Sequence, residues 1–157
     1  MKKSHVLAGA LVVVAGLVGT ACSSSSDDTC DAVKIDNAWV RLPPAANTAL
    51  YMDITNEGSS TISLTGAESD FAATYELHES MMVEGQMVME KVPGQEIPVA
   101  AGTTTHLKPG GLHVMAIDVQ EPLEVGDEKT FTLEFTDGCS KEITAPVEMA
   151  EMASNGG

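Results

Sequence analysis

Basic residues are scarce in this chain, where eight lysines and arginines stand against 23 aspartates and glutamates, a formal net charge of −15. Two of the lysines are Lys2 and Lys3, so the rest of the chain has six basic residues against 23 acidic ones, a net charge of −17. Such an acidic protein is repelled by nucleic acid and by anionic lipid. The composition therefore excludes a nucleic-acid-binding function, and the acid excess indicates a solvated exterior rather than a metal site.

Hydrophobic runs are short as well. The apolar run from Val6 to Val18 is below the roughly 20 residues that span a bilayer, and with the preceding lysines it is typical of an export signal. Small residues, Gly19 to Ala21, lead to Cys22 and then to a Ser- and Asp-rich stretch. This pattern resembles the lipobox of bacterial lipoproteins, although Gly19 replaces the usual aliphatic residue.

We therefore predict a signal peptide over residues 1–21 and a lipidated polar tether over residues 22–29. Lipid on Cys22 would anchor the protein at the extracytoplasmic face of the bacterial cell membrane. The alternative is an ordinary secretory signal cleaved near Ala21, in which case Cys22 has no role.

Cysteine is almost absent from the remaining chain, which has Cys30 near its start and Cys139 near its end. Disulfides persist outside the cytoplasm, so we predict that these two residues are bonded. A thiolate metal site is the alternative, and the lack of close CxxC spacing disfavours it.

Helical periodicity is missing too, and alternation of apolar and polar residues takes its place. The alternating apolar positions are Leu50, Met52 and Ile54, then Ile62 and Leu64, then Phe131, Leu133 and Phe135. Period-two runs cut by Gly, Pro, Asn and Asp about every ten residues predict one β-sandwich or barrel domain. We assign it residues 30–149, followed by a flexible tail over residues 150–157. The pattern does not separate a cupredoxin-like sandwich from an immunoglobulin-like one.

What the chain does contain is a concentration of soft ligands. All three histidines beyond the leader and five of the nine methionines lie between His78 and Met115. Imidazole and thioether are ligand types, and thioether selects Cu(I) over harder ions. The segment therefore predicts a site for a soft metal, with Cu(I) the expected ion.

A two-residue turn at Glu84-Gly85 would place the candidates on one surface. In that register Met82 opposes Met87, and Ser80 opposes Met89. His78 and Met89 then become diagonal neighbours, about 7–8 Å apart at the backbone. His113 and Met115 lie two residues apart on another strand and also share a face. Two such pairs, on two hairpins, can converge on one ion.

Some residues of the segment have simpler explanations. Met52 is expected to fill the core, because single methionines in strands usually do. Met81 is expected on the face opposite Met82, and His106 on the surface. The predicted metal ligands are His78, Met89, His113 and Met115, with Met82 and Met87 as auxiliary candidates.

These residues resemble the motif of the PCu(A)C-type periplasmic copper chaperones. The chain has His78, ten residues, Met89, then 23 residues before His113-Val-Met115, with Leu107-Lys-Pro-Gly-Gly111 just ahead. Ala38-Trp-Val-Arg41 is similar to the start of the family domain. The gap of 23 is about two residues longer than is usual, and the excess falls in the loop 93–98.

The resemblance implies a cupredoxin-like Greek-key β-barrel or sandwich that carries one exposed Cu(I) site. It also implies delivery of copper to the copper subunit of cytochrome c oxidase or its assembly factors. We expect the protein to be a monomer. We also expect that it is not an enzyme, because the motif has no nucleophile-elbow context. A blue-copper electron carrier would need a cysteine ligand, which the motif lacks. Copper buffering or resistance, and a non-metal β-sandwich interaction module, remain alternatives.

Overall fold

The computed structural model describes residues 30–150, which form ten strands and two short 3-10 turns. The strands are β1 (Val33–Arg41), β2 (Thr48–Asn56), β3 (Ile62–Glu68), β4 (Ala72–Val83), β5 (Gln86–Lys91), β6 (Ile97–Val99), β7 (Thr103–Leu107), β8 (Leu112–Val119), β9 (Glu128–Phe135) and β10 (Ser140–Glu148). The 3-10 turns are η1 (Pro93–Gln95) and η2 (Thr136–Gly138). No helix within residues 30–150 is long and apolar enough to cross a membrane.

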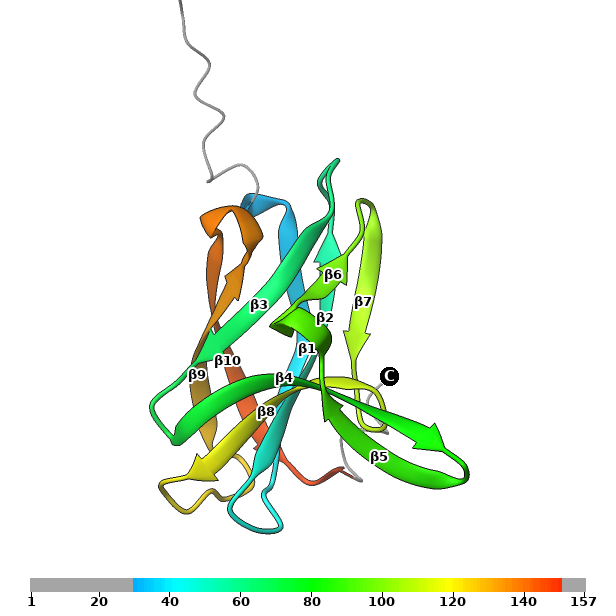
Figure 1. Cartoon of the computed structure of the whole chain (residues 1–157). Coiled ribbons are helices and arrows are strands. Elements are labelled where there is room, and N and C mark those ends of the chain that lie inside the picture. The colour runs from blue at the N-terminus through cyan, green and yellow to red at the C-terminus, as the bar shows by residue number, and fades with distance from the viewer. Residues whose placement is uncertain (1–29, 151–157) are drawn as a thin grey trace, which may run out of the picture.

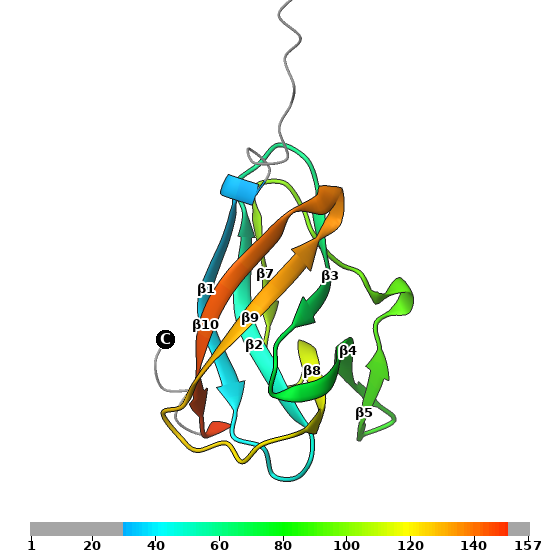
Figure 2. The same ribbon diagram turned by 90° about the vertical axis from the view of Figure 1, so that its left-hand side faces the viewer.

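The strands form two layers that enclose one core (Figures 1 and 2). Neighbouring strands follow the order β5-β4-β8-β2-β1-β10-β9-β3-β6, and β7 pairs with β2 beside this path. All pairs are antiparallel except β1 with β10, which are parallel and join the two layers. Because the path has two free ends, the structure is a sandwich rather than a closed barrel. The predicted all-β fold is confirmed.

Alternation along the strands explains the core. On β9 the side chains of Phe131, Leu133 and Phe135 are buried, as the sequence pattern predicts. β2 differs, because it lies between β1, β7 and β8 and buries Tyr51 as well as Leu50 and Met52. Burying one large apolar side chain stabilises the folded state by roughly 1.5–3 kcal/mol, so the central strand β2 contributes strongly to the stability of the core.

The β4–β5 hairpin has the predicted register. Its turn residues Glu84 and Gly85 have φ angles of 51° and 82°, and positive φ at both positions is the hairpin geometry that matches strand twist. Met82 lies opposite Met87, and Ser80 lies opposite Met89. Figure 1 shows the hairpin extending away from the body of the sandwich.

The prediction that His113 and Met115 lie on a second hairpin, around the Pro109–Gly111 turn, is wrong. β7 and β8 are joined by the Pro109–Gly111 turn, but no ladder pairs them within the described chain. β7 pairs with β2 instead, while β8 pairs with both β2 and β4. The reason is that β7 and β8 pair with successive stretches of the same edge of β2, residues 52–56 and 48–50, so the turn carries the chain onward along β2 rather than folding it back on itself.

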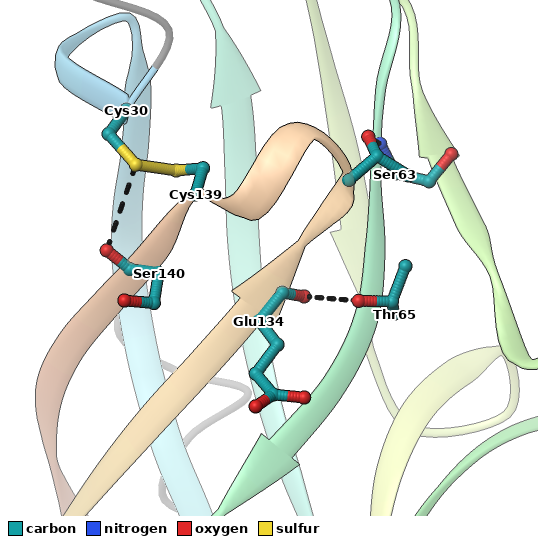
Figure 3. Close-up of a disulfide and its surroundings, with 7 residues drawn as sticks. Cys30, Ser63, Thr65, Glu134, Cys139 and Ser140 are labelled. Atoms are coloured by element: carbon teal, nitrogen blue, oxygen red, sulfur yellow. Dashed lines mark hydrogen bonds between the residues drawn. A yellow bond between two sulfur atoms is a disulfide. The ribbon is translucent and has the colours of Figure 1, made fainter. Parts of the chain in front are cut away.

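Cys30 and Cys139 are joined by a disulfide with a Cα–Cα distance of 5.3 Å (Figure 3). It ties the residues just before β1 to the junction of η2 and β10, across 109 positions of sequence. Nearby, the Thr65 hydroxyl donates a hydrogen bond of 3.1 Å to the Glu134 carbonyl between β3 and β9. The disulfide therefore connects the N-terminal and C-terminal parts of the domain, and neither cysteine belongs to the β4–β5 hairpin.

Candidate metal centre

The ladder between β4 and β8 brings the two candidate histidines together. His78 lies directly opposite His113, and their ring centroids are 5.9 Å apart. Two positions along the same ladder, Met115 lies opposite Glu76. Because opposed residues of an antiparallel pair share a face, these four side chains lie on one surface of the sheet.

His113 is held in the form that binds a metal. Its Nδ1 lies 3.0 Å from the Gly111 carbonyl, which only accepts, so Nδ1 carries the hydrogen and Nε2 keeps its lone pair. Nε2 is buried and has no hydrogen-bond partner within residues 30–150. Burial lowers the pKa of His113, and the neighbouring His78 lowers it further, while the Gly111 bond opposes them. The ring is therefore neutral at neutral pH.

His78 has the complementary arrangement. Its Nε2 lies 2.9 Å from a carboxylate oxygen of Glu76, which fixes the hydrogen on Nε2. Its Nδ1 is buried, again with no partner in the described part of the chain. The other oxygen of Glu76 accepts a 2.6 Å hydrogen bond from Lys91. Lys91 and then His78 hold the pKa of Glu76 below its usual range, so the carboxylate is ionised.

The two candidate methionines adjoin the rings. Met89, on β5, is 49 % exposed, and Met115, on β8, is half-buried. A cavity of about 240 Å³ has Met89, His113 and Met115 in its lining, together with Arg41 and Tyr51. The structure thus brings three predicted ligands into one cavity, with His78 beside His113.

Thioethers are essential to any metal site here. No group of three or more His, Cys, Asp or Glu side chains among the described residues could hold a metal ion. Two imidazole nitrogens fall short of the four ligands that zinc takes, and the further ligand types beside them are the thioethers of Met89 and Met115. Such a set suits a soft ion such as Cu(I) and suits zinc poorly.

The remaining methionines and the third histidine lie elsewhere. Met52 is 1 % exposed and belongs to the core, as predicted. The His106 side chain is 59 % exposed and contacts Asp53 at 2.6 Å, which agrees with its predicted surface position. Met82 and Met87 lie on the face of Met89 but near the hairpin tip, 63 % and 59 % exposed. Met81 is 37 % exposed on the other face.

Sequence reasoning missed Glu76 and Tyr51. Glu76 lies two positions before His78, and that spacing alone places it on the same face of a strand. Tyr51 packs against both Trp39, at 4.7 Å between centroids, and His113, at 6.0 Å. No local signal identified Tyr51, because its contact with His113 crosses from β2 to β8.

Comparisons with known proteins show the family to which the chain belongs. The family model described as "Putative lipoprotein LpqE-like" matches residues 33–147, which is most of the chain. The chain belongs to the LpqE-like family. A relative from Leifsonia xyli subsp. xyli (strain CTCB07), named "Putative lipoprotein Lxx21020", is 35% identical over 157 residues, with 94% of this chain and 93% of the relative covered.

Two solved structures that are similar to this LpqE-like protein have titles that name copper. "Copper-bound PCuAC domain from PmoF2" has a TM-score of 0.62 at 25% identity, covering 75% of this chain and 93% of that one. "Solution structure of CuI-DR1885 from Deinococcus Radiodurans" has a TM-score of 0.58 at 34% identity, covering 73% and 76%. The predicted cupredoxin-like fold and the resemblance to the PCu(A)C type are therefore confirmed.

Glu76 offers a first test of the site. A group that orients a metal-binding imidazole typically contributes 10–100-fold to metal affinity, so Glu76→Ala is expected to lower Cu(I) affinity by about that factor. Glu76→Gln keeps an acceptor for His78 and should recover most of the loss. The measurement is competition against a chromophoric Cu(I) chelator. Glu79→Ala removes the same charge from the opposite face and is the matched control, and equal effects of both alanine variants would contradict the assigned role.

Proposed function

We propose that this LpqE-like protein is an extracytoplasmic copper chaperone that binds one Cu(I) ion as cargo through His78, Met89, His113 and Met115. The observation that carries the proposal is the pair of buried imidazole nitrogens that have no hydrogen-bond partner among residues 30–150. A buried polar atom left unpaired costs about 1–3 kcal/mol, and a bound metal ion would remove that cost at both nitrogens. The copper named in the titles of two similar structures supports the choice of ion.

The ligand chemistry suits carriage rather than storage or catalysis. All four ligands are neutral, so the site lacks the charged thiolate that would hold Cu(I) most tightly. Thioethers and imidazoles also avoid the thiol oxidation expected outside the cytoplasm. Met89 is about half exposed, which leaves one side of the site open to a recipient protein.

We further propose the predicted chain layout as part of this function. It comprises a signal peptide over residues 1–21, a tether over 22–29 lipidated at Cys22, the copper domain over 30–149 and the tail over 150–157. Residues 1–29 and 151–157 lie outside the described structure, and the lipoprotein name of the Leifsonia relative supports the anchor. An anchored, monomeric carrier would meet membrane oxidases on that face of the membrane.

The proposed recipient is the copper subunit of cytochrome c oxidase or one of its assembly factors. A deletion strain carrying either the wild-type gene or the His113→Leu variant tests this. With copper limiting, delivery predicts low oxidase activity and low oxidase copper in the variant strain, both restored by added copper. Normal oxidase together with poor growth in excess copper would instead indicate the second candidate function, copper buffering, which the same open site would permit.

The site should also respond to pH. Only neutral imidazole binds a metal, and burial keeps His113 neutral until the pH falls below the ordinary histidine pKa of about 6.5. Cu(I) affinity is therefore expected to fall as the pH is lowered from about 7 to about 5, without complete loss, because thioethers do not titrate. The measurement is chelator competition corrected for the pH dependence of the chelator.

The control for this pH response is the double variant His78→Ala/His113→Ala. It should bind Cu(I) weakly through Met89 and Met115 and show a flatter pH dependence. An equally steep response in the double variant would mean that the protons act elsewhere and would remove the two histidines from the ligand set.

A further inference from the structure

The β4–β5 hairpin carries an exposed group of apolar side chains, of which the four-ligand site uses only Met89. Five large apolar side chains of β4 and β5 are exposed on this hairpin: Met81, Met82, Val83, Met87 and Met89. Large apolar side chains exposed together often mark a functional surface. Three of the five are methionines on one face, namely Met82, Met87 and Met89.

Met82 and Met87 are suited to share a ligand. They are directly opposed in the β4–β5 ladder, so their Cβ atoms lie about 4.5–5.5 Å apart, a gap that two flexible thioethers can close around one ion. Their hairpin face continues with Ser80 and Met89, and within the hairpin its pairs include no carboxylate. The acidic pair Glu79 and Glu90 lies on the opposite face. Among the paired residues of this face, hard cations therefore find no carboxylate ligand beside the two sulfur atoms.

Met87 also leans toward the copper site. A Cβ placed on Gly110 would lie 4.0 Å from Met87 Cε, so the side chain reaches over the Pro109–Gly111 turn. That turn leads directly into β8, where His113 is the second residue. Met89 follows Met87 by two positions on the same face of β5. The thioethers of Met82, Met87 and Met89 thus form a row from the hairpin tip to the cavity that holds His113.

We propose that Met82 and Met87 form a second, weaker Cu(I) site that takes the ion first and passes it through Met89 to His78 and His113. The proposal rests on the four-ligand function above. Overall, two Cu–S bonds to Met82 and Met87 break while two Cu–S and two Cu–N bonds to the four ligands form; this is ligand exchange alone, so copper stays Cu(I) and no oxidant or reductant is needed. Two neutral thioethers bind more weakly than four ligands, which gives the transfer its direction.

The variant for the test is Met82→Leu/Met87→Leu, because leucine keeps the volume and apolar surface but removes sulfur. In stopped-flow transfer from a chromophoric Cu(I) chelator, the double variant is expected to load about tenfold more slowly than the wild type. Its equilibrium affinity for the first Cu(I) equivalent should be unchanged. Met81→Leu, on the opposite face of the same hairpin, is the matched control and should load at the wild-type rate.

A second measurement locates the ion. In protein labelled at the methionine methyl groups, Ag(I) added beyond one equivalent as a stable Cu(I) substitute should shift the Met82 and Met87 resonances. The same shifts should appear in His113→Leu, where the deeper site is damaged, so this result is independent of the proposed function. Absence of the shifts overturns the second site. Wild-type loading rates in the double leucine variant overturn the transfer step and assign the exposed methionines to apolar contact alone.

Discussion

Replacing His113 with leucine is expected to lower Cu(I) affinity by at least about 100-fold while the domain stays folded. Outer groups that merely orient a ligand contribute 10–100-fold, so a direct ligand should contribute no less than the upper end of that range. Stability should be preserved because His113 is 1 % exposed and leucine replaces a buried nitrogen that has no partner among the described residues. The Gly111 carbonyl keeps a 3.0 Å hydrogen bond from the Ser80 amide.

Chelator competition and urea unfolding, measured on the same variant, separate these two effects. Met89→Leu/Met115→Leu tests the thioethers in the same way, because leucine conserves volume and removes only the ligand. Met52→Leu is the matched control, since Met52 is buried in the core and should leave Cu(I) affinity unchanged. Wild-type affinity in the His113 variant, or in the double methionine variant, would refute the proposed ligand set.

Removing the disulfide with Cys30→Ala/Cys139→Ala is expected to lower the free energy of unfolding by about 2–5 kcal/mol. The bond spans 109 positions, so its loss greatly increases the conformational freedom of the unfolded chain, and the chain-entropy model gives a value near the top of that range. A single domain of this size often has only 5–15 kcal/mol of stability, so the change should be large in a urea titration.

Copper affinity provides the control for this prediction. The disulfide joins the start of β1 to β10, whereas the candidate ligands lie on β4, β5 and β8, so Cu(I) binding by the folded variant should match the wild type. Thiol titration of unfolded, unreduced wild-type protein should find neither Cys30 nor Cys139. Two titratable thiols would show that the pair is reduced and would cancel the expected stability difference.

Much of the local structure was predictable because it depends on short-range rules. Gly85 readily adopts the positive φ that a two-residue turn needs, and once the turn is known, the period of two determines which residues of β4 oppose which residues of β5. The same alternation identified β9 as half-buried. The failure at β7 and β8 has the same origin, since a turn containing Gly indicates a reversal or a corner equally well, and only the availability of β2 decided between them.

The soft ligand types, their spacing and the strand faces on which they lie follow from residue chemistry and the two-residue period, and they could be read without a fold. The pairing of β4 with β8, which places His78 opposite His113 and Glu76 opposite Met115, emerged only from the folded domain. That pairing also decided which imidazole nitrogens are engaged by Glu76 and Gly111 and which are left without a partner within residues 30–150. A ladder between strands far apart in sequence depends on how the whole core packs, and local periodicity holds no information about that packing.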